Sequence, residues 1–146
     1  MAYKHFRPTP GRYGMVPALL SSAVPTCTAN ATVTVYVPTP AISAYVESAS
    51  FLLTTLAADA DGILTVKLFK WDKSAGAGVA LTDAMGLETG DAAVVKEPKK
   101  FTIGAVTEAA RTLEDGDSLY LDYVSNSAAI DTQPVGFVVV ELAILE

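Results

Sequence analysis

Residues 63–71, with the sequence ILTVKLFKW, form the stretch from which the fold of this chain is most directly predicted. Turn-forming stretches at 58–62 and 72–78 flank it, and its side chains alternate with the period of a β-strand. One face is aliphatic and typical of a hydrophobic core: Leu64, Val66 and Leu68. The other face combines a charge with two large aromatic rings, so we expect another surface to cover it: Thr65, Lys67, Phe69 and Trp71.

Three further stretches have strand patterns. Thr32–Val37 and Ser118–Ser125 alternate apolar and polar side chains, and the turn sequence 114–117 precedes the second of them. Residues 42–53 are apolar on both faces, and Ser48 and Ser50 interrupt the alternation, which predicts a bulge nearby. We assign Tyr45, Ala49, Phe51 and Leu53 to one face of that strand, and Val46 and Leu52 to the other.

The last apolar stretch, residues 135–145 (VGFVVVELAIL), has apolar side chains on both faces and only one charge, Glu141. The β-branched residues 138–140 disfavour a helix, because branched side chains lose rotamer freedom there. We therefore predict a strand buried on two sides. It is expected either in the centre of a sheet or against another subunit.

The remaining patterns are weaker. Residues 81–86 and 106–113 each predict one helical turn, the second capped by Thr107, and residues 92–96 and 100–103 are short strand candidates. Together these patterns predict an all-β fold: an antiparallel β-sandwich of jelly-roll type, with one or two short helical turns and an extended N-terminal arm.

We divide the chain into an arm, residues 1–31, and a sandwich domain, residues 32–146. Prolines and glycines break any helical or strand period in the arm: Pro8, Pro10, Gly11, Gly14, Pro17 and Pro25. The arm is nevertheless too apolar for a solvated tail. We expect it to lie either on its own sandwich or on a neighbouring subunit.

Composition restricts the function further. The chain has 146 residues, of which 51% are hydrophobic and 18% charged, so surplus apolar surface is expected at subunit contacts. Its net charge of −6 disfavours nucleic acid as a partner, whereas Lys4, Arg7 and Arg12 make the arm basic. No apolar run is long enough to span a bilayer, and the single Cys27 predicts no internal disulfide. We expect synthesis in the cytoplasm and no membrane partner.

Catalytic patterns are weak. His5 is the one histidine, so a histidine-based metal site or proton relay is not expected. Residues 59–62 (DADG) begin like a calcium loop, but strand residues follow where further oxygen ligands are required. No spacing among the 16 acids selects a catalytic pair. We therefore expect no catalytic residue, no metal, no cofactor and no enzymatic activity.

Two segments carry a resemblance to a known class of protein. They are AYVESASFLLTTLAADADGILTVKLFKWDKSAGAGVALTDAMGLE and TEAARTLEDGDSLYLDYVSNSAAIDTQPVGFVVVELAIL, which together cover most of residues 44–145. Their layout resembles that of the capsid cement or decoration proteins of tailed bacteriophages: an AYVES strand, a DADG turn, a TEAARTL turn before GDSLYL, and QPVGF before the last strand.

The resemblance implies a virion structural protein that binds the outer surface of the assembled head and stabilises it. The implied partners are the major capsid protein and further copies of this chain, as a homotrimer or, second, a dimer, without nucleic acid or membrane. The implied location is the capsid surface, after synthesis in the bacterial cytoplasm. The residues that we expect at these contacts are Tyr3, His5, Phe6, Arg7, Arg12, Tyr13, Phe69, Trp71, Phe137 and Val139.

Two other functions stay open on the sequence. The first is a carbohydrate-binding β-sandwich module, or a tail-fibre or receptor-binding component of a virion. This function needs exposed aromatic side chains on a concave face, for which the candidates are Trp71, Phe69, Tyr36 and Tyr120. The second is a hydrolase on the same fold, which needs acids that converge.

Overall fold

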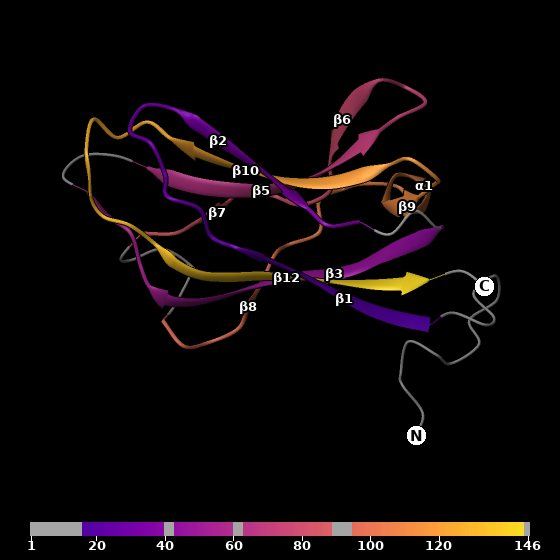
Figure 1. Ribbon diagram of the computed structural model, residues 1–146, viewed down its shortest axis with the longest axis horizontal. Helices are drawn as coiled ribbons and strands as arrows, with labels where there is room; N and C mark the ends of the chain where they lie inside the picture. Colours follow the sequence, from indigo (N-terminus) through magenta and orange to yellow (C-terminus); the bar gives the residue numbers. More distant parts are fainter. Residues whose placement is uncertain (1–15, 40–42, 60–62, 89–94, 145–146) are drawn as a thin grey trace.

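The computed structural model describes residues 16–39, 43–59, 63–88 and 95–144. In this part of the chain two antiparallel β-sheets lie face to face as the two layers of a sandwich (Figure 1). The prediction of an all-β sandwich is confirmed.

The first layer is here called sheet A. Its strand order is β1 (Val16–Ala23), β12 (Val135–Ile144), β3 (Ala44–Thr55) and β8 (Lys99–Lys100). A fifth strand, β9 (Thr112–Leu113), also pairs with β3. The second layer is here called sheet B. Its strand order is β2 (Thr32–Val37), β10 (Ser118–Ser125), β5 (Leu64–Asp72) and β6 (Ala77–Ala80). A fifth strand, β7 (Met85–Gly86), also pairs with β5. A two-stranded ribbon joins β4 (Ala58–Asp59) to β11 (Ile130–Thr132), and the short helix α1 spans Glu108–Arg111. The chain passes from sheet A to sheet B and back as it runs through β1, β2 and β3.

The alternating strands of sheet B form as predicted. Leu64, Val66 and Leu68 of β5 are fully buried, and β10 buries Leu119, Leu121 and Tyr123 in the same way. The last strand forms and is central as predicted, because β12 lies between β1 and β3 (Figure 1). The predicted burial on two sides is wrong for this strand: its inner face is buried, but Val135 and Phe137 on the outer face are more than half exposed.

A bulge in β3 changes which side chains share a face. Opposite β12, the pairing steps from Glu141↔Ser48 to Leu142↔Val46, so Glu47 is the extra residue. The predicted bulge near Ser48 is therefore confirmed. The predicted faces are wrong for two residues: Val46 joins Ala49 in the core, and Tyr45 lies on the outer face.

The prediction that residues 1–31 contain no strand is wrong for Val16–Ala23. These residues form β1, which pairs along its whole length with β12, from Val16↔Ile144 to Ala23↔Phe137. Pro17 is tolerated because β1 is an edge strand of the described sheet, where β12 is its one neighbour. This part of the arm lies on its own sandwich, whereas residues 1–15 are outside the described residues.

The predicted helical turn at residues 81–86 is also wrong. The backbone N–H of Leu81 donates to Leu68 O at 2.9 Å, and that of Leu87 donates to Leu64 O at 3.0 Å. The segment therefore pairs with β5 instead of closing hydrogen bonds within itself, and it buries Leu81, Met85 and Leu87.

The other weak predictions are confirmed in part. Helix α1 begins at the predicted cap, where Thr107 Oγ1 accepts a hydrogen bond from the backbone N–H of Ala110 at 3.2 Å. Of the candidate 100–103, Lys100 lies in β8 and Ile103 bridges to Thr82. Of the candidate 92–96, residues 92–94 lie outside the described residues, and Val95 bridges to Leu53.

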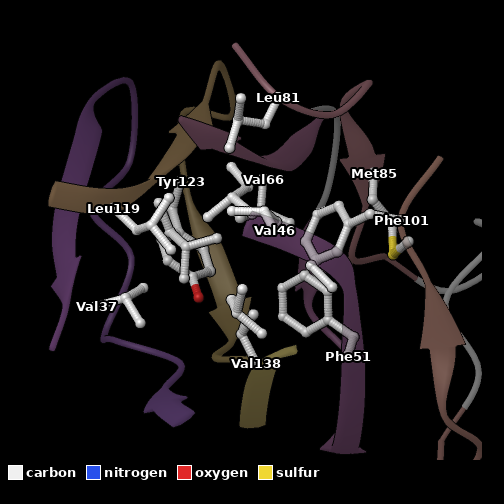
Figure 2. Close-up of a cluster of buried hydrophobic side chains, with 14 of the residues drawn as sticks. Val37, Val46, Phe51, Val66, Leu81, Met85, Phe101, Leu119, Tyr123 and Val138 are labelled. Carbon is white, nitrogen blue, oxygen red and sulfur yellow. The ribbon is translucent and has the colours of Figure 1, made fainter. Parts of the chain in front are cut away.

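The core lies between the two sheets. Figure 2 shows side chains from both layers meeting there, among them Val46, Phe51 and Val138 from sheet A and Val66 and Tyr123 from sheet B. Among the described residues the buried Tyr123 hydroxyl has no hydrogen-bond partner, and burial raises its pKa far above the ordinary value.

The Cys27 thiol predicts a pH dependence of stability. Burial raises the pKa of this thiol from 9.0 to about 11, so the unfolded chain ionises at a lower pH than the folded chain. The contribution of this thiol to the free energy of unfolding is therefore fully present below pH 9 and is lost between pH 9 and pH 11. We expect urea unfolding to show that the free energy of unfolding falls by about 2 kcal/mol more in wild type than in a Cys27→Ala variant between pH 8 and pH 10.5. Equal losses in the two proteins would contradict the assignment, because the variant shares the other titrating groups, including Tyr123.

Candidate functional site

The outer faces of the two sheets hold the candidate functional surfaces. Cross-strand partners point to the same side of a sheet, so the observed registers decide which side chains gather on each face. Within the described residues there is no pocket, and no group of three or more His, Cys, Asp or Glu side chains lies close enough to hold a metal. In the same part of the chain, no helix combines the length and the apolar character needed to cross a membrane.

Sheet A has a bare apolar patch on its outer face. Phe137 of β12 lies directly opposite Leu52 of β3, and these side chains are 54% and 40% exposed. Leu19 of β1 is 71% exposed, and Val135 is 53% exposed. We call the following set the sheet A patch: Leu19, Leu52, Val135, Phe137 and the half-buried Val139.

The other end of the same face is covered. Arg111 of α1 places its guanidinium carbon 4.5 Å from the centroid of the Tyr45 ring. Its Nη2 donates to Val46 O at 2.7 Å and to Glu47 O at 2.9 Å, which fixes it against the bulge of β3. Tyr45 and Ala143 are buried there, where Tyr45 pairs with Thr112 of β9. Figure 1 shows β9 beside α1 at this end of the sandwich. The patch is therefore the part of this face that α1 does not reach.

Sheet B carries a row of aromatic side chains on its outer face. The register aligns Tyr36 of β2, Tyr120 of β10 and Phe69 of β5 across the sheet. The Tyr120 ring is stacked on Phe69 with centroids 5.1 Å apart, and its centroid is 5.9 Å from that of Tyr36. Trp71 follows Phe69 on the same face and is 42% exposed, while Tyr36 is 67% exposed. We call these four residues the aromatic row.

Polar groups lie beside the aromatic row. The next row of the register contains Thr34, Asp122 and Lys67. Thr34 Oγ1 donates to Asp122 Oδ1 at 2.5 Å, and Lys67 Nζ is 5.9 Å from the Phe69 ring centroid. Partial burial, and then the charge of Asp122, raise the pKa of the Tyr120 hydroxyl.

Gly78 of β6 gives the Tyr120 ring its space. A Cβ at this position would lie 2.1 Å from Tyr120 Oη, so any larger residue would displace the ring. The absence of a side chain at Gly78 therefore helps to set the arrangement of the aromatic row.

A charged cluster at one end of the sandwich is centred on a buried lysine. Lys70 continues the inner face of β5 and is 5% exposed. Its Nζ donates to Thr112 O at 3.1 Å and lies 3.6 Å from Asp117 Oδ2 and 3.8 Å from Asp72 Oδ2. Hydrogen bonds from the Ser74 hydroxyl and the Ala75 N–H lower the pKa of Asp72, so this carboxylate stays charged. We assign the cluster a structural role, because its members bond to one another and to turn backbone.

The residues predicted at contacts do not form one surface. Phe69 and Trp71 lie on the outer face of sheet B, and Phe137 and Val139 lie on the outer face of sheet A, on opposite sides of the sandwich. The structure does bring Tyr36 and Tyr120 beside Phe69, as the carbohydrate-binding alternative requires. The remaining predicted contact residues lie outside the described residues: Tyr3, His5, Phe6, Arg7, Arg12 and Tyr13.

Three residues of the sheet A patch were not among the contact residues predicted from the sequence. Leu52 carried a signal, since it was assigned to a different face of its strand from Phe51 and Leu53. Leu19 could not be assigned a face, because β1 had not been predicted as a strand. Val135 stands at the start of β12, where a second pairing shift between Val135 and Gly136 changes its neighbours.

No protein-family model matches the chain, and no curated protein matches it in sequence.

Proposed function

We propose that this chain is a capsid cement or decoration protein, a virion structural protein that binds the outer surface of an assembled phage head as a homo-oligomer. The observation that carries the proposal is the sheet A patch, where four large apolar side chains are each at least 40% exposed on one sheet face. Exposed apolar side chains that gather on one face mark contact surfaces in soluble proteins.

The position of the patch supports the proposal. It lies on the β1, β12 and β3 strands, which pair along most of their length, so its side chains are held on a rigid support. A contact on a rigid sheet loses little conformational entropy when it forms. Many copies that bind around a symmetric shell gain avidity even when each contact is weak.

The topology also supports the resemblance noted in the sequence. The orders β1-β12-β3-β8 and β2-β10-β5-β6 place the first and last strands side by side, and the chain passes repeatedly between the two layers. We propose that this arrangement is a jelly roll, an architecture found in capsid proteins. The resemblance favours a homotrimer, with a dimer as the second arrangement, and the major capsid protein as partner.

A double variant, Leu52→Ser with Phe137→Ser, tests the proposal. These two side chains face each other across β3 and β12, and both are exposed, so their loss removes contact area without opening the core. We expect wild type to be an oligomer by light scattering, and the double variant to associate at least about 100-fold more weakly. Its free energy of unfolding should change by no more than about 1 kcal/mol.

The matched control is Val124→Ser, which removes an apolar side chain of similar exposure, 42%, from the outer face of the other sheet. It should associate as wild type does. Co-sedimentation with assembled heads of the encoding phage, and with its free coat protein, supplies the second measurement. A monomeric wild type that does not sediment with heads would overturn the proposal.

A further inference from the structure

The aromatic row lies on the opposite side of the sandwich from the sheet A patch, so the proposed function does not use it. We infer that the outer face of sheet B is a carbohydrate-binding surface. On this surface pyranose rings stack on the exposed aromatic side chains. The sugar hydroxyl groups form hydrogen bonds with the adjacent row of Thr34, Asp122 and Lys67.

The chemistry of the face matches that of a sugar. A pyranose ring presents a flat C–H face and a rim of hydroxyl groups. The negative face of an aromatic ring attracts polarised C–H groups, and Tyr36 and Trp71 are the two most exposed members of the row. In the adjacent row Asp122 offers carboxylate acceptors and Lys67 offers ammonium donors. A sugar hydroxyl can therefore both donate and accept a hydrogen bond there.

The row is also held in place before any ligand arrives. Phe69 and Tyr120 are stacked with an angle of 7° between their planes, and Gly78 leaves room for the Tyr120 hydroxyl. All four rings stand on paired strands of sheet B. Aromatic side chains that are already ordered lose little entropy on binding, which favours a shallow contact with a neutral ligand.

Charge selects sugar over single-stranded nucleic acid, which also stacks on aromatic rows. Nucleic acid binding requires a positive groove along the phosphate backbone. The chain carries a net charge of −6, and on this face Asp122 lies directly opposite Lys67, so the positive charge is balanced. The complementary ligand is therefore an uncharged saccharide.

The single tryptophan makes the test direct, because Trp71 is the only such residue in the chain and belongs to the row. The full chain is first applied to an array of bacterial, fungal and plant glycans. Saccharides that bind are then titrated in solution while the Trp71 emission is recorded, with cellopentaose, chitopentaose and an oligothymidylate as fixed probes. We expect at least one neutral glycan to give a saturable change in emission, and the oligothymidylate to give none.

Variants that keep the reporter complete the test. Tyr36→Ala should weaken binding at least about 10-fold, and Asp122→Asn should weaken it less. Val124→Ser, on the same face but two rows of the register away from the Tyr120 and Phe69 pair, should bind as wild type does. The Leu52→Ser, Phe137→Ser double variant should also retain full binding, which separates this inference from the proposed function.

Three results would overturn the inference. The first is an array with no bound glycan. The second is a response to oligothymidylate alone. The third is a Trp71 emission that changes with protein concentration in the absence of sugar, since this would identify the row as a contact between copies of the chain.

Discussion

Replacing Asp117 with Ala is expected to lower the free energy of unfolding by about 3–5 kcal/mol, because it leaves the buried Lys70 charge without its nearest acidic partner. Asp117 Oδ2 is 3.6 Å from Lys70 Nζ, and both side chains are almost fully buried, at 5% and 6% exposure. Asp72 remains at 3.8 Å from Lys70 but is more exposed.

Asp117 also satisfies two backbone groups. Its Oδ1 accepts from the N–H of Lys73 at 2.9 Å, and its Oδ2 accepts from the N–H of Glu114 at 3.0 Å. The substitution therefore removes hydrogen bonds from two turns in addition to the ion pair.

Urea unfolding followed by circular dichroism measures the effect. The control is Asp115→Ala, two residues away in the same turn and exposed, which should change stability by no more than about 0.5 kcal/mol. Adding Lys70→Met to Asp117→Ala should recover part of the loss, since no unpaired ammonium is then buried. A loss below about 1 kcal/mol in Asp117→Ala would show that the ion pair does not hold this end of the sandwich.

Gly136→Ala is expected to lower the free energy of unfolding by about 3 kcal/mol through overpacking. A Cβ at this position would lie 2.2 Å from Leu52 O and 2.7 Å from Leu53 Cα. Both atoms belong to the backbone of β3, so no flexible side chain can move aside. The pairing shift beside Gly136 brings the β12 and β3 backbones together at this point.

Gly104→Ala is the matched control, because the nearest atom to a Cβ there is 3.7 Å away, in ordinary contact. Its stability should stay within about 0.5 kcal/mol of wild type. Thermal and urea unfolding of the two variants, measured side by side, separate a steric effect from a general effect of replacing glycine. Equal stability of the two variants would mean that β12 and β3 can move apart at this position.

Much of the fold could be predicted because alternation is a local property of the chain. Residues 32–37, 63–71 and 118–125 each show one apolar face, and the observed strands bury those faces. The cap at Thr107 and the bulge near Ser48 were also local signals. The segment 81–86 was mistaken for a helical turn because its hydrogen-bond partners are on β5, which no local pattern reveals.

The candidate surfaces were only partly predictable. Phe69 and Trp71 were recognised as unusual on an outer face, and Phe137 and Val139 as surplus apolar residues. That these pairs lie on opposite sides of the sandwich follows from the strand order, which brings together residues far apart in sequence. The registers that align Tyr36, Tyr120 and Phe69, and that set Leu52 opposite Phe137, are long-range in the same sense.

The sequence by itself determined that this protein is built from antiparallel strands and which side of several strands enters the core, because side-chain direction alternates along a strand whatever its neighbours are. Only the tertiary structure decided which apolar side chains remain outside. The bulge at Glu47 turns Tyr45 outward, Arg111 then covers it, and the far end of the same face is left bare. Exposure is a property of neighbours in space, and neighbours are fixed by pairing and packing between distant segments.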